Sequence, residues 1–219
     1  MRERKVSMKF IIFALSLLSL AFAATKDKPH GHKGVLEVYS GQLIPFKVSS
    51  DQEKKLAKGD NINFNERVGK SGRGVVIQDI NATTTICMNK IRDLSIYPKV
   101  VPNVKKVQVY ESLTHRNGTA KTNAKFDISV LGMKFGYFLA LTHEPKYNTL
   151  TWTLDYRYNS DFDDNVGHWQ VLTPILYITI NITITSSKTS LLTSSSFSAL
   201  LIGYEASFSV GMVACTILY

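Results

Sequence analysis

Cysteine is scarce in this sequence: its 219 residues include only Cys87 and Cys215. Two cysteines permit one disulfide in an oxidising compartment, but they cannot build the disulfide framework of a small secreted domain. Cys87 also falls in a helical apolar pattern, where a buried thiol is commoner than a bonded one. A pairing of Cys87 with Cys215 is therefore left open.

Catalytic and metal-binding motifs are also absent. The chain has no nucleophile elbow, no glycine-rich phosphate loop between a strand and a helix, and no cluster of metal ligands. Asp161, Asp163 and Asp164 lie close together, but the glycine and the distal glutamate of a calcium loop are missing, so we interpret them as a turn. We expect no metal and no cofactor.

Charge is missing from the end of the chain and plentiful before it. The stretch 171–219 contains only Lys188 and Glu205, although the whole sequence carries 26 Lys and Arg against 17 Asp and Glu. The net charge of +9 is compatible with an anionic membrane surface or a nucleic acid. Aromatic residues are not interleaved with the basic ones, so we expect no nucleic-acid partner. The basic residues are interpreted as a solvated surface, with peripheral membrane contact as the alternative.

The first 23 residues have the pattern of a secretory signal peptide. An apolar run over 10–22 follows four basic residues and ends in Ala21-Phe22-Ala23. The run is shorter than the roughly 20 residues that a helix needs to cross a bilayer. We therefore predict an extracellular or endoplasmic reticulum location. A basic leader over 24–34 leaves import into a complex plastid as the alternative.

Three N-glycosylation sequons begin at Asn81, Asn117 and Asn181. Only Asn117 falls in an obvious turn, Arg116-Asn117-Gly118, so it is the residue expected to carry a glycan after entry into the secretory pathway.

The remaining chain divides into three parts. We predict a polar leader and linker over 24–73, with short strands at 35–38 and 43–48 allowed. A compact domain over 74–171 follows, and then an apolar tail rich in Ser and Thr over 172–219.

Within the compact domain, the pattern begins with a strand over 74–80. Asn81 is the expected cap of a helix over 83–92, and Pro98 and Pro102 keep any later helix short. Alternating apolar residues then predict an antiparallel meander whose apolar face needs a cover. Its expected strands are 104–114, 121–130, 134–143, 149–156 and 166–171, and the Ile- and Thr-rich stretch 173–187 is one further candidate.

The segment 74–171 resembles the START-like superfamily, which includes polyketide cyclases and coenzyme Q-binding proteins, and within it the plant and algal lipid-transport branch. The resemblance depends on Val76-Ile-Gln-Asp-Ile-Asn-Ala82, Ile91-Arg-Asp-Leu-Ser-Ile-Tyr-Pro98, Val107-Gln-Val-Tyr-Glu111 and Leu150-Thr-Trp-Thr-Leu-Asp-Tyr156, followed by Gly167-His-Trp169. It implies an α+β helix-grip fold, in which a curved antiparallel sheet surrounds a long C-terminal helix and a hydrophobic ligand lies between them.

The tail departs from that family. No charged amphipathic helix is evident over 172–219, so we expect the C-terminal helix to be atypical or missing. The tail is interpreted as divergent, or as the product of a mispredicted gene model or of an alternative splice. A membrane tether formed by the apolar residues after Ser198 is a third interpretation.

The resemblance and the missing catalytic motifs lead us to expect a non-catalytic protein that binds, carries or stores a lipid, quinone or pigment. A cyclase- or dehydratase-type enzyme using His143 or His168 in the same cavity, with Asp155 or Asp163 as partner, is the alternative. Tyr137 and Trp152 are favoured as ligand contacts because each has a polar group beside an apolar body. The candidate ligand-binding residues, which plain core packing would also explain, are Phe126, Ile128, Phe135, Tyr137, Leu139, Trp152, Leu154 and Trp169.

Overall fold

The computed structural model describes residues 34, 36–68, 71–130, 132–172 and 177–185, and for 67–68 and 177–185 only the backbone is described. The helices in these ranges are α2 (Ser50–Leu56), α3 (Thr84–Arg92), α4 (Tyr97–Val100) and the 3-10 helix η1 (Pro145–Tyr147). The strands are β1 (Ile62–Val68), β2 (Ser71–Asp79), β3 (Val104–Thr114), β4 (Ala120–Val130), β5 (Met133–Glu144), β6 (Thr149–Leu154), β7 (Asp164–Leu172) and β8 (Tyr177–Thr185).

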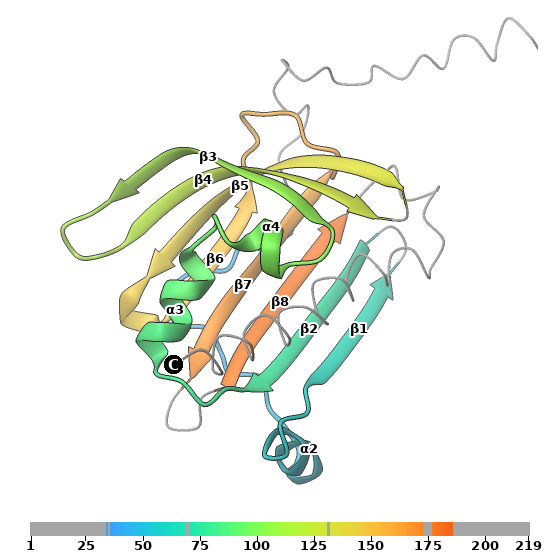
Figure 1. Ribbon diagram of the computed structural model, residues 1–219, viewed down its shortest axis with the longest axis vertical. Coiled ribbons are helices and arrows are strands. Elements are labelled where there is room, and N and C mark those ends of the chain that lie inside the picture. The colour runs from blue at the N-terminus through green and yellow to red at the C-terminus, as the bar shows by residue number, and fades with distance from the viewer. Residues whose placement is uncertain (1–33, 35, 69–70, 131, 173–176, 186–219) are drawn as a thin grey trace, which may run out of the picture.

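The strands of the described ranges form one antiparallel sheet in the order β1-β2-β8-β7-β6-β5-β4-β3. Two register shifts interrupt the pairing of β3 with β4, between Val104 and Lys106 and between Val109 and Glu111. Such bulges bend a strand and increase its twist. Figure 1 shows the resulting curvature: β3 and β4 cross over the rest of the sheet, and α3 and α4 lie on its inner, concave side.

The meander predicted from residue 104 onward is confirmed. In β4 the side chains of Ala124, Phe126, Ile128 and Val130 are buried, while those between them are partly exposed. Successive side chains of a strand point to opposite faces, so this alternation places the buried set on the concave face. The further strand expected within 173–187 is also confirmed, as β8.

The helix α3 begins one residue later than predicted, and the predicted cap was wrong. The hydroxyl of Thr83, not the side chain of Asn81, accepts the backbone N–H of Ile86 in the first turn, at 3.3 Å. The buried face of α3 carries Cys87 and Ile91. The Tyr97 hydroxyl then donates to the Ile91 carbonyl over 2.7 Å, which ties the short α4 to the end of α3.

The sheet extends beyond both ends of the predicted compact domain. The segment interpreted as linker contains α2 and β1, and β1 pairs with β2 along its whole length. At the other end β8 lies between β2 and β7. The short strands allowed at 35–38 and 43–48 are not formed, because the described residues there make no ladder with another strand.

Residues 36–48 instead cross the convex face of the sheet, and we call them the strap. The backbone N–H of Leu36 donates to Asp164 over 2.8 Å, and that of Gly41 donates to Glu144 over 3.0 Å. A small second core on the same face joins Leu56, Ile62, Val75 and Ile77, with Val48 and Phe64 packed against it.

Several predictions from the sequence concern residues outside the described ranges. They are the signal peptide over 1–23, the C-terminal helix, the apolar stretch after Ser198 and the pairing of Cys87 with Cys215; Cys87 itself is buried. Within the part of the chain that is described, no helix has both the length and the apolar character needed to cross a bilayer.

Candidate functional site

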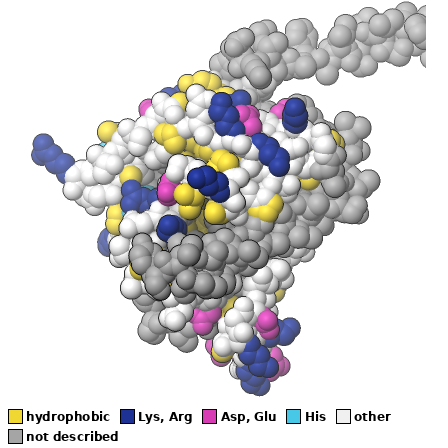
Figure 2. Space-filling view, in the orientation of Figure 1, with side chains coloured by type: hydrophobic (Ala, Val, Ile, Leu, Met, Phe, Trp, Pro, Cys, Tyr) yellow, Lys and Arg dark blue, Asp and Glu magenta, His cyan; other side chains and the backbone are white. Residues whose placement is uncertain are grey.

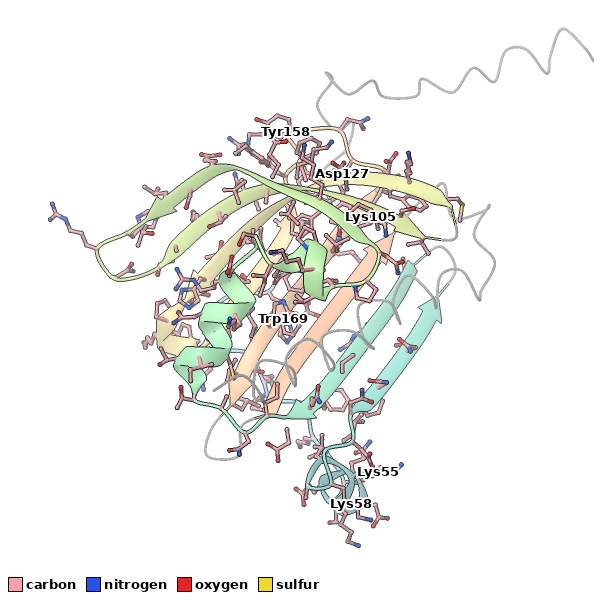
Figure 3. The ribbon with its side chains drawn as sticks, in the orientation of Figure 1. Lys55, Lys58, Lys105, Asp127, Tyr158 and Trp169 are labelled. Atoms are coloured by element: carbon pink, nitrogen blue, oxygen red, sulfur yellow. The ribbon has the colours of Figure 1, made fainter. Side chains whose placement is uncertain are left out.

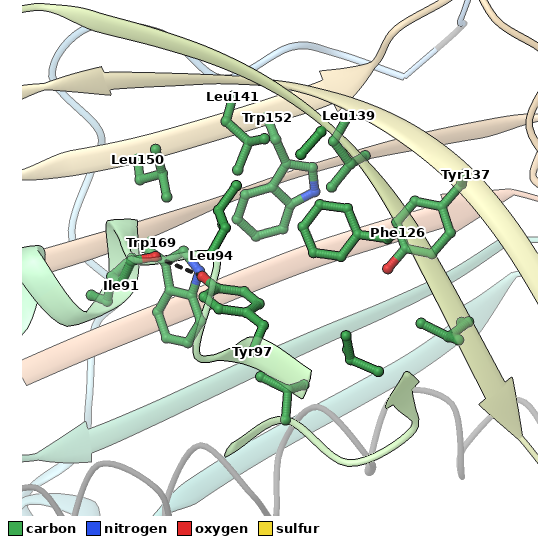
Figure 4. Close-up of a cluster of buried hydrophobic side chains, with 14 of the residues drawn as sticks. Ile91, Leu94, Tyr97, Phe126, Tyr137, Leu139, Leu141, Leu150, Trp152 and Trp169 are labelled. Atoms are coloured by element: carbon green, nitrogen blue, oxygen red, sulfur yellow. Dashed lines mark hydrogen bonds between the residues drawn. The ribbon is translucent and has the colours of Figure 1, made fainter. Parts of the chain in front are cut away.

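The concave face holds the main apolar cluster, and all eight candidate ligand-binding residues belong to it or pack against it. Seven are buried, and Phe135 is half-buried. Figure 4 shows aromatic rings from opposite elements meeting in this cluster. The ring of Phe126 stacks on that of Tyr137 at 5.4 Å, and Tyr97 from α4 approaches the same ring edge-on at 6.1 Å. Register therefore brings together residues that the sequence predicted to be near one another.

Trp152 uses its polar group inside the protein. Its indole N–H donates to the Asn165 side-chain oxygen over 3.0 Å, and the pair is buried. Asn165 lies on β7, beside β6, and its side chain shares the concave face with Trp169. The polar group that favoured Trp152 as a ligand contact therefore holds two strands together.

A cavity of about 570 Å³ lies at one end of the concave face, between the end of α3 and the strands β3 to β6. Leu94, Leu141 and Leu150 belong both to this cavity and to the main cluster, so the apolar interior continues into its floor. Polar groups surround the floor. The full lining is Asn89, Arg92, Asp93, Leu94, Ser95, Val109, Ser112, Ala120, Thr122, Leu141, His143 and Leu150.

His143 is the buried ionisable group of this cavity, with a residue exposure of 6%. Its Nδ1 atom has no hydrogen-bond partner among the described residues. Burial lowers the pKa of His143 to about 4, and the positive charge of Arg92 contributes to that lowering. The imidazole is therefore neutral at pH 7, with one nitrogen that donates and one that accepts.

His168 does not line the cavity that contains His143, so of the two alternative candidates for the acid or base only His143 lies there. It precedes Trp169 on β7 and so lies on the convex face, where the Tyr39 ring of the strap contacts it edge-on at 4.4 Å. The alternation of side chains along a strand could have shown this from the sequence, once Trp169 was assigned to the interior.

Asp155 is paired with other groups. It accepts hydrogen bonds from the Tyr110 hydroxyl at 2.8 Å and from the Arg157 guanidinium at 2.7 Å. Burial acts to raise the pKa of Asp155, but these hydrogen bonds outweigh it and hold the pKa below its ordinary value. The Asp161 carboxylate likewise accepts the Gly136 N–H at 2.7 Å, which fastens the turn after β6 to β5.

A second cavity, of about 760 Å³, lies at the opposite end of β4 and β5 and includes two of the predicted residues, Ile128 and Phe135. Its charged lining residues are Lys105, Lys106, Lys125 and Lys134, with Asp127 and Asp161 as the acidic members. Lys125 and Asp127 form an ion pair at 2.9 Å. Figure 2 shows basic and hydrophobic side chains side by side in the upper part of the view. Figure 3, in the same orientation, places Lys105 and Asp127 near each other, above the buried Trp169.

Apart from His143, sequence reasoning did not assign the lining residues of the first cavity to a site. Leu141 lies two residues after the predicted Leu139, and Leu150 two residues before the predicted Trp152, so both follow from extending the same alternation. No sequence pattern pointed to Arg92 and Leu94, because the end of a helix meets a strand only through the tertiary fold.

Asn117 is exposed in the β3–β4 turn, where its side chain accepts the Thr119 N–H at 3.0 Å; its glycosylation stays a prediction.

Comparison with known proteins gives structural but no sequence relatives. No family model matches the chain, and no curated protein matches it. The fold is similar to that of TTHA0849 from Thermus thermophilus, with a TM-score of 0.51 and 13% identity over 66% of this chain and 99% of that one. Ginseng major latex-like protein 151 from Panax ginseng also matches, with a TM-score of 0.47 and 13% identity over 65% of this chain and 97% of that one. The Zhui aromatase/cyclase from Streptomyces sp. R1128 gives 0.44 and 12% over 66% and 88%.

These neighbours have START-like, helix-grip folds. Together with the curved antiparallel sheet and the two short helices between β2 and β3, the first similarity confirms the predicted α+β helix-grip fold class. At such low identity the likeness extends to the fold alone.

Proposed function

We propose that the protein binds a hydrophobic small molecule on the concave face of its sheet, for transport or storage, and does not transform it. The observation that carries this proposal is the cavity of about 570 Å³ whose leucine floor continues the apolar cluster and whose wall contains the buried, neutral His143. The volume falls within the roughly 300–1,000 Å³ common for small-molecule sites.

The lining defines the chemistry of the ligand. An apolar body lying on Leu94, Leu141 and Leu150 gains about 25 cal/mol for each Å² removed from water. A hydroxyl or carbonyl at the end of that body finds a partner in His143 or Arg92. A lipid, a quinone or a pigment with one polar end fits both requirements, and the coenzyme Q-binding or lipid-transport type of ligand belongs to this proposal.

His143 also gives the alternative function, a cyclase- or dehydratase-type enzyme, its one specific support, because a buried imidazole in a cavity is a candidate acid or base. Its electrostatics favour binding. A general base works best with a pKa near the operating pH, whereas burial and Arg92 both lower the pKa of His143, to about 4.

The test is extraction of the purified full-length protein with organic solvent, read by mass spectrometry. We expect a stoichiometric apolar ligand from the natural protein and much less from Thr122→Trp, which fills the cavity from a half-buried position. Lys121→Trp is the matched control, because the neighbouring residue is exposed and outside the cavity lining. No ligand from correctly folded natural protein, or equal loss in the two variants, contradicts the proposal.

The lysine-bordered cavity supports a proposed contact with an anionic membrane. Exposed Lys105 and Lys106 stand beside the half-buried Phe135, a combination suited to anionic headgroups above apolar chains. We expect Lys105→Glu with Lys106→Glu to reduce sedimentation with phosphatidylserine vesicles. Lys55→Glu with Lys58→Glu is the control at the far end of the molecule (Figure 3), and an equal effect there argues against a membrane-binding surface at this cavity.

Secretion, or plastid import, is also part of the proposal and is tested by locating a tagged full-length chain.

A further inference from the structure

A third cavity, of about 360 Å³, lies on the convex face, between the strap and strands β2 and β7. It is separated from the proposed ligand site by the thickness of the sheet. Its floor comes from His168 and Gln170 of β7, and its cover comes from strap residues that include Tyr39, Leu43 and Phe46.

The two polar floor residues are nearly inaccessible to solvent, with exposures of 6% for His168 and 4% for Gln170. The Gln170 amide donates from Nε2 to the Leu43 carbonyl over 3.1 Å. The other polar atom of this amide is the acceptor Oε1. Within the described ranges, neither this Oε1 atom nor the Nδ1 atom of His168 has a hydrogen-bond partner. A buried polar group without a partner costs roughly 1–3 kcal/mol, so a ligand that pairs both gains affinity.

We propose that this cavity is a second binding site, for an uncharged molecule that carries two hydroxyl groups on an apolar ring. Gln170 Oε1 only accepts, so the ligand must donate to it. The Nδ1 atom of His168 donates in one neutral tautomer and accepts in the other, and a hydroxyl suits both. Because residues two apart on a strand are separated by about 7 Å, one hydroxyl serves each group.

The other described lining residues favour an uncharged ligand with an apolar part. Glu37 and Arg73 in its lining balance each other, and burial, followed by the charge of Arg73, lowers the pKa of His168 to about 4, so the imidazole is neutral. Apolar Leu43, Phe46 and Val75 make no hydrogen bonds to water through their side chains. They give an apolar ring a surface to contact beside the two polar floor residues.

The test is NMR titration of the full-length protein with resorcinol, an aromatic diol, following the His168 imidazole nitrogens and the Gln170 side-chain amide. The matched compound is 1,3-dimethoxybenzene, which keeps the ring and lacks the donors. We expect saturable shifts at both residues with resorcinol and none with the dimethoxy compound. Equal shifts with both compounds, or no saturable shift with resorcinol, overturn the proposal.

Variants separate this site from the concave one. Gln170→Met should weaken resorcinol binding by at least roughly 5- to 10-fold, because it removes the acceptor of one neutral hydrogen bond as well as the amide donor to the Leu43 carbonyl. Ser40→Trp, at an exposed strap position in the cavity lining, should block it without touching the core. Thr122→Trp should leave these shifts unchanged. Shifts that survive Ser40→Trp, or that Thr122→Trp abolishes, reject the convex site while leaving the proposed function intact.

Discussion

His168 and Trp169 are consecutive on β7 and belong to different compartments of the protein. Trp169 packs in the concave apolar cluster, whereas the His168 ring is covered by Tyr39 of the strap on the convex face. The sheet of this chain is thus covered on both sides among the described residues. The strap on the convex face buries polar side chains such as His168, which would contact water if that face were exposed.

Both buried histidines should make the stability of the protein depend on pH. Burial lowers the pKa of His143 and His168 from 6.5 to about 4, so between pH 6.5 and 4 the unfolded state binds more protons than the native state. Stability is therefore complete above pH 6.5 and falls as the pH drops towards 4. For His168 the loss is at most ~3 kcal/mol, and urea unfolding at several pH values measures it.

His168→Phe should flatten that pH dependence, and His143→Phe should flatten it less, because His143 borders the more open cavity. His115 lies in the exposed β3–β4 turn and is the control, so His115→Phe should leave the slope unchanged. A natural protein equally stable at pH 7 and pH 4.5 would contradict the buried, neutral state of both groups.

The strap should stabilise the fold through Leu43 and not through its neighbour. Leu43 is 8% exposed and its carbonyl accepts the Gln170 amide, whereas Ile44 is 90% exposed. We expect Leu43→Ala to lower the free energy of unfolding by about 2 kcal/mol, the smaller end of the range for buried leucines. Ile44→Ala should change it by less than about 0.5 kcal/mol. Equal effects of the two changes in urea unfolding would show that the strap does not pack as described.

The start of α3 offers a direct choice between two caps. Thr83→Ala removes the hydroxyl that accepts the Ile86 N–H and should cost about 1 kcal/mol of stability. Asn81→Ala should be nearly neutral, because Asn81 is exposed and lies outside the cap. Thermal unfolding of the two variants compares them, and a larger loss for Asn81→Ala would restore the cap predicted from the sequence.

The Trp152–Asn165 hydrogen bond should contribute more to the stability of the protein than the additional apolar area that an indole buries relative to a phenyl ring. Trp152→Phe keeps an aromatic ring but leaves the buried Asn165 oxygen without its donor, which costs roughly 1–3 kcal/mol. Trp152→Phe combined with Asn165→Leu should recover part of the loss, since both polar partners are then gone. Urea unfolding of the single and double variants measures this, and no recovery in the double variant would show that packing and not the hydrogen bond is responsible.

The sequence by itself determined the meander and its inner face. Alternation in 121–130 and 134–143 predicted that Phe126, Tyr137 and Leu139 share one side, because a strand repeats every two residues whatever its neighbours are. The same rule, applied more fully, would have added Leu141 and Leu150 to the site and moved His168 to the other face.

Only the tertiary structure decided that β1 belongs to the sheet, where β8 is inserted in it, and what covers its two faces. The strand β1 pairs with β2, its neighbour in a hairpin. The strand β8 pairs with β7 and with β2, which lies far from it along the chain. The strap shows no regular alternation of apolar and polar residues. It is held by hydrogen bonds to side chains and by packing on a sheet face built from distant strands. Long-range pairing and packing of this kind leave no local signal, so both cavities that involve α3 or the strap became visible only in the folded protein.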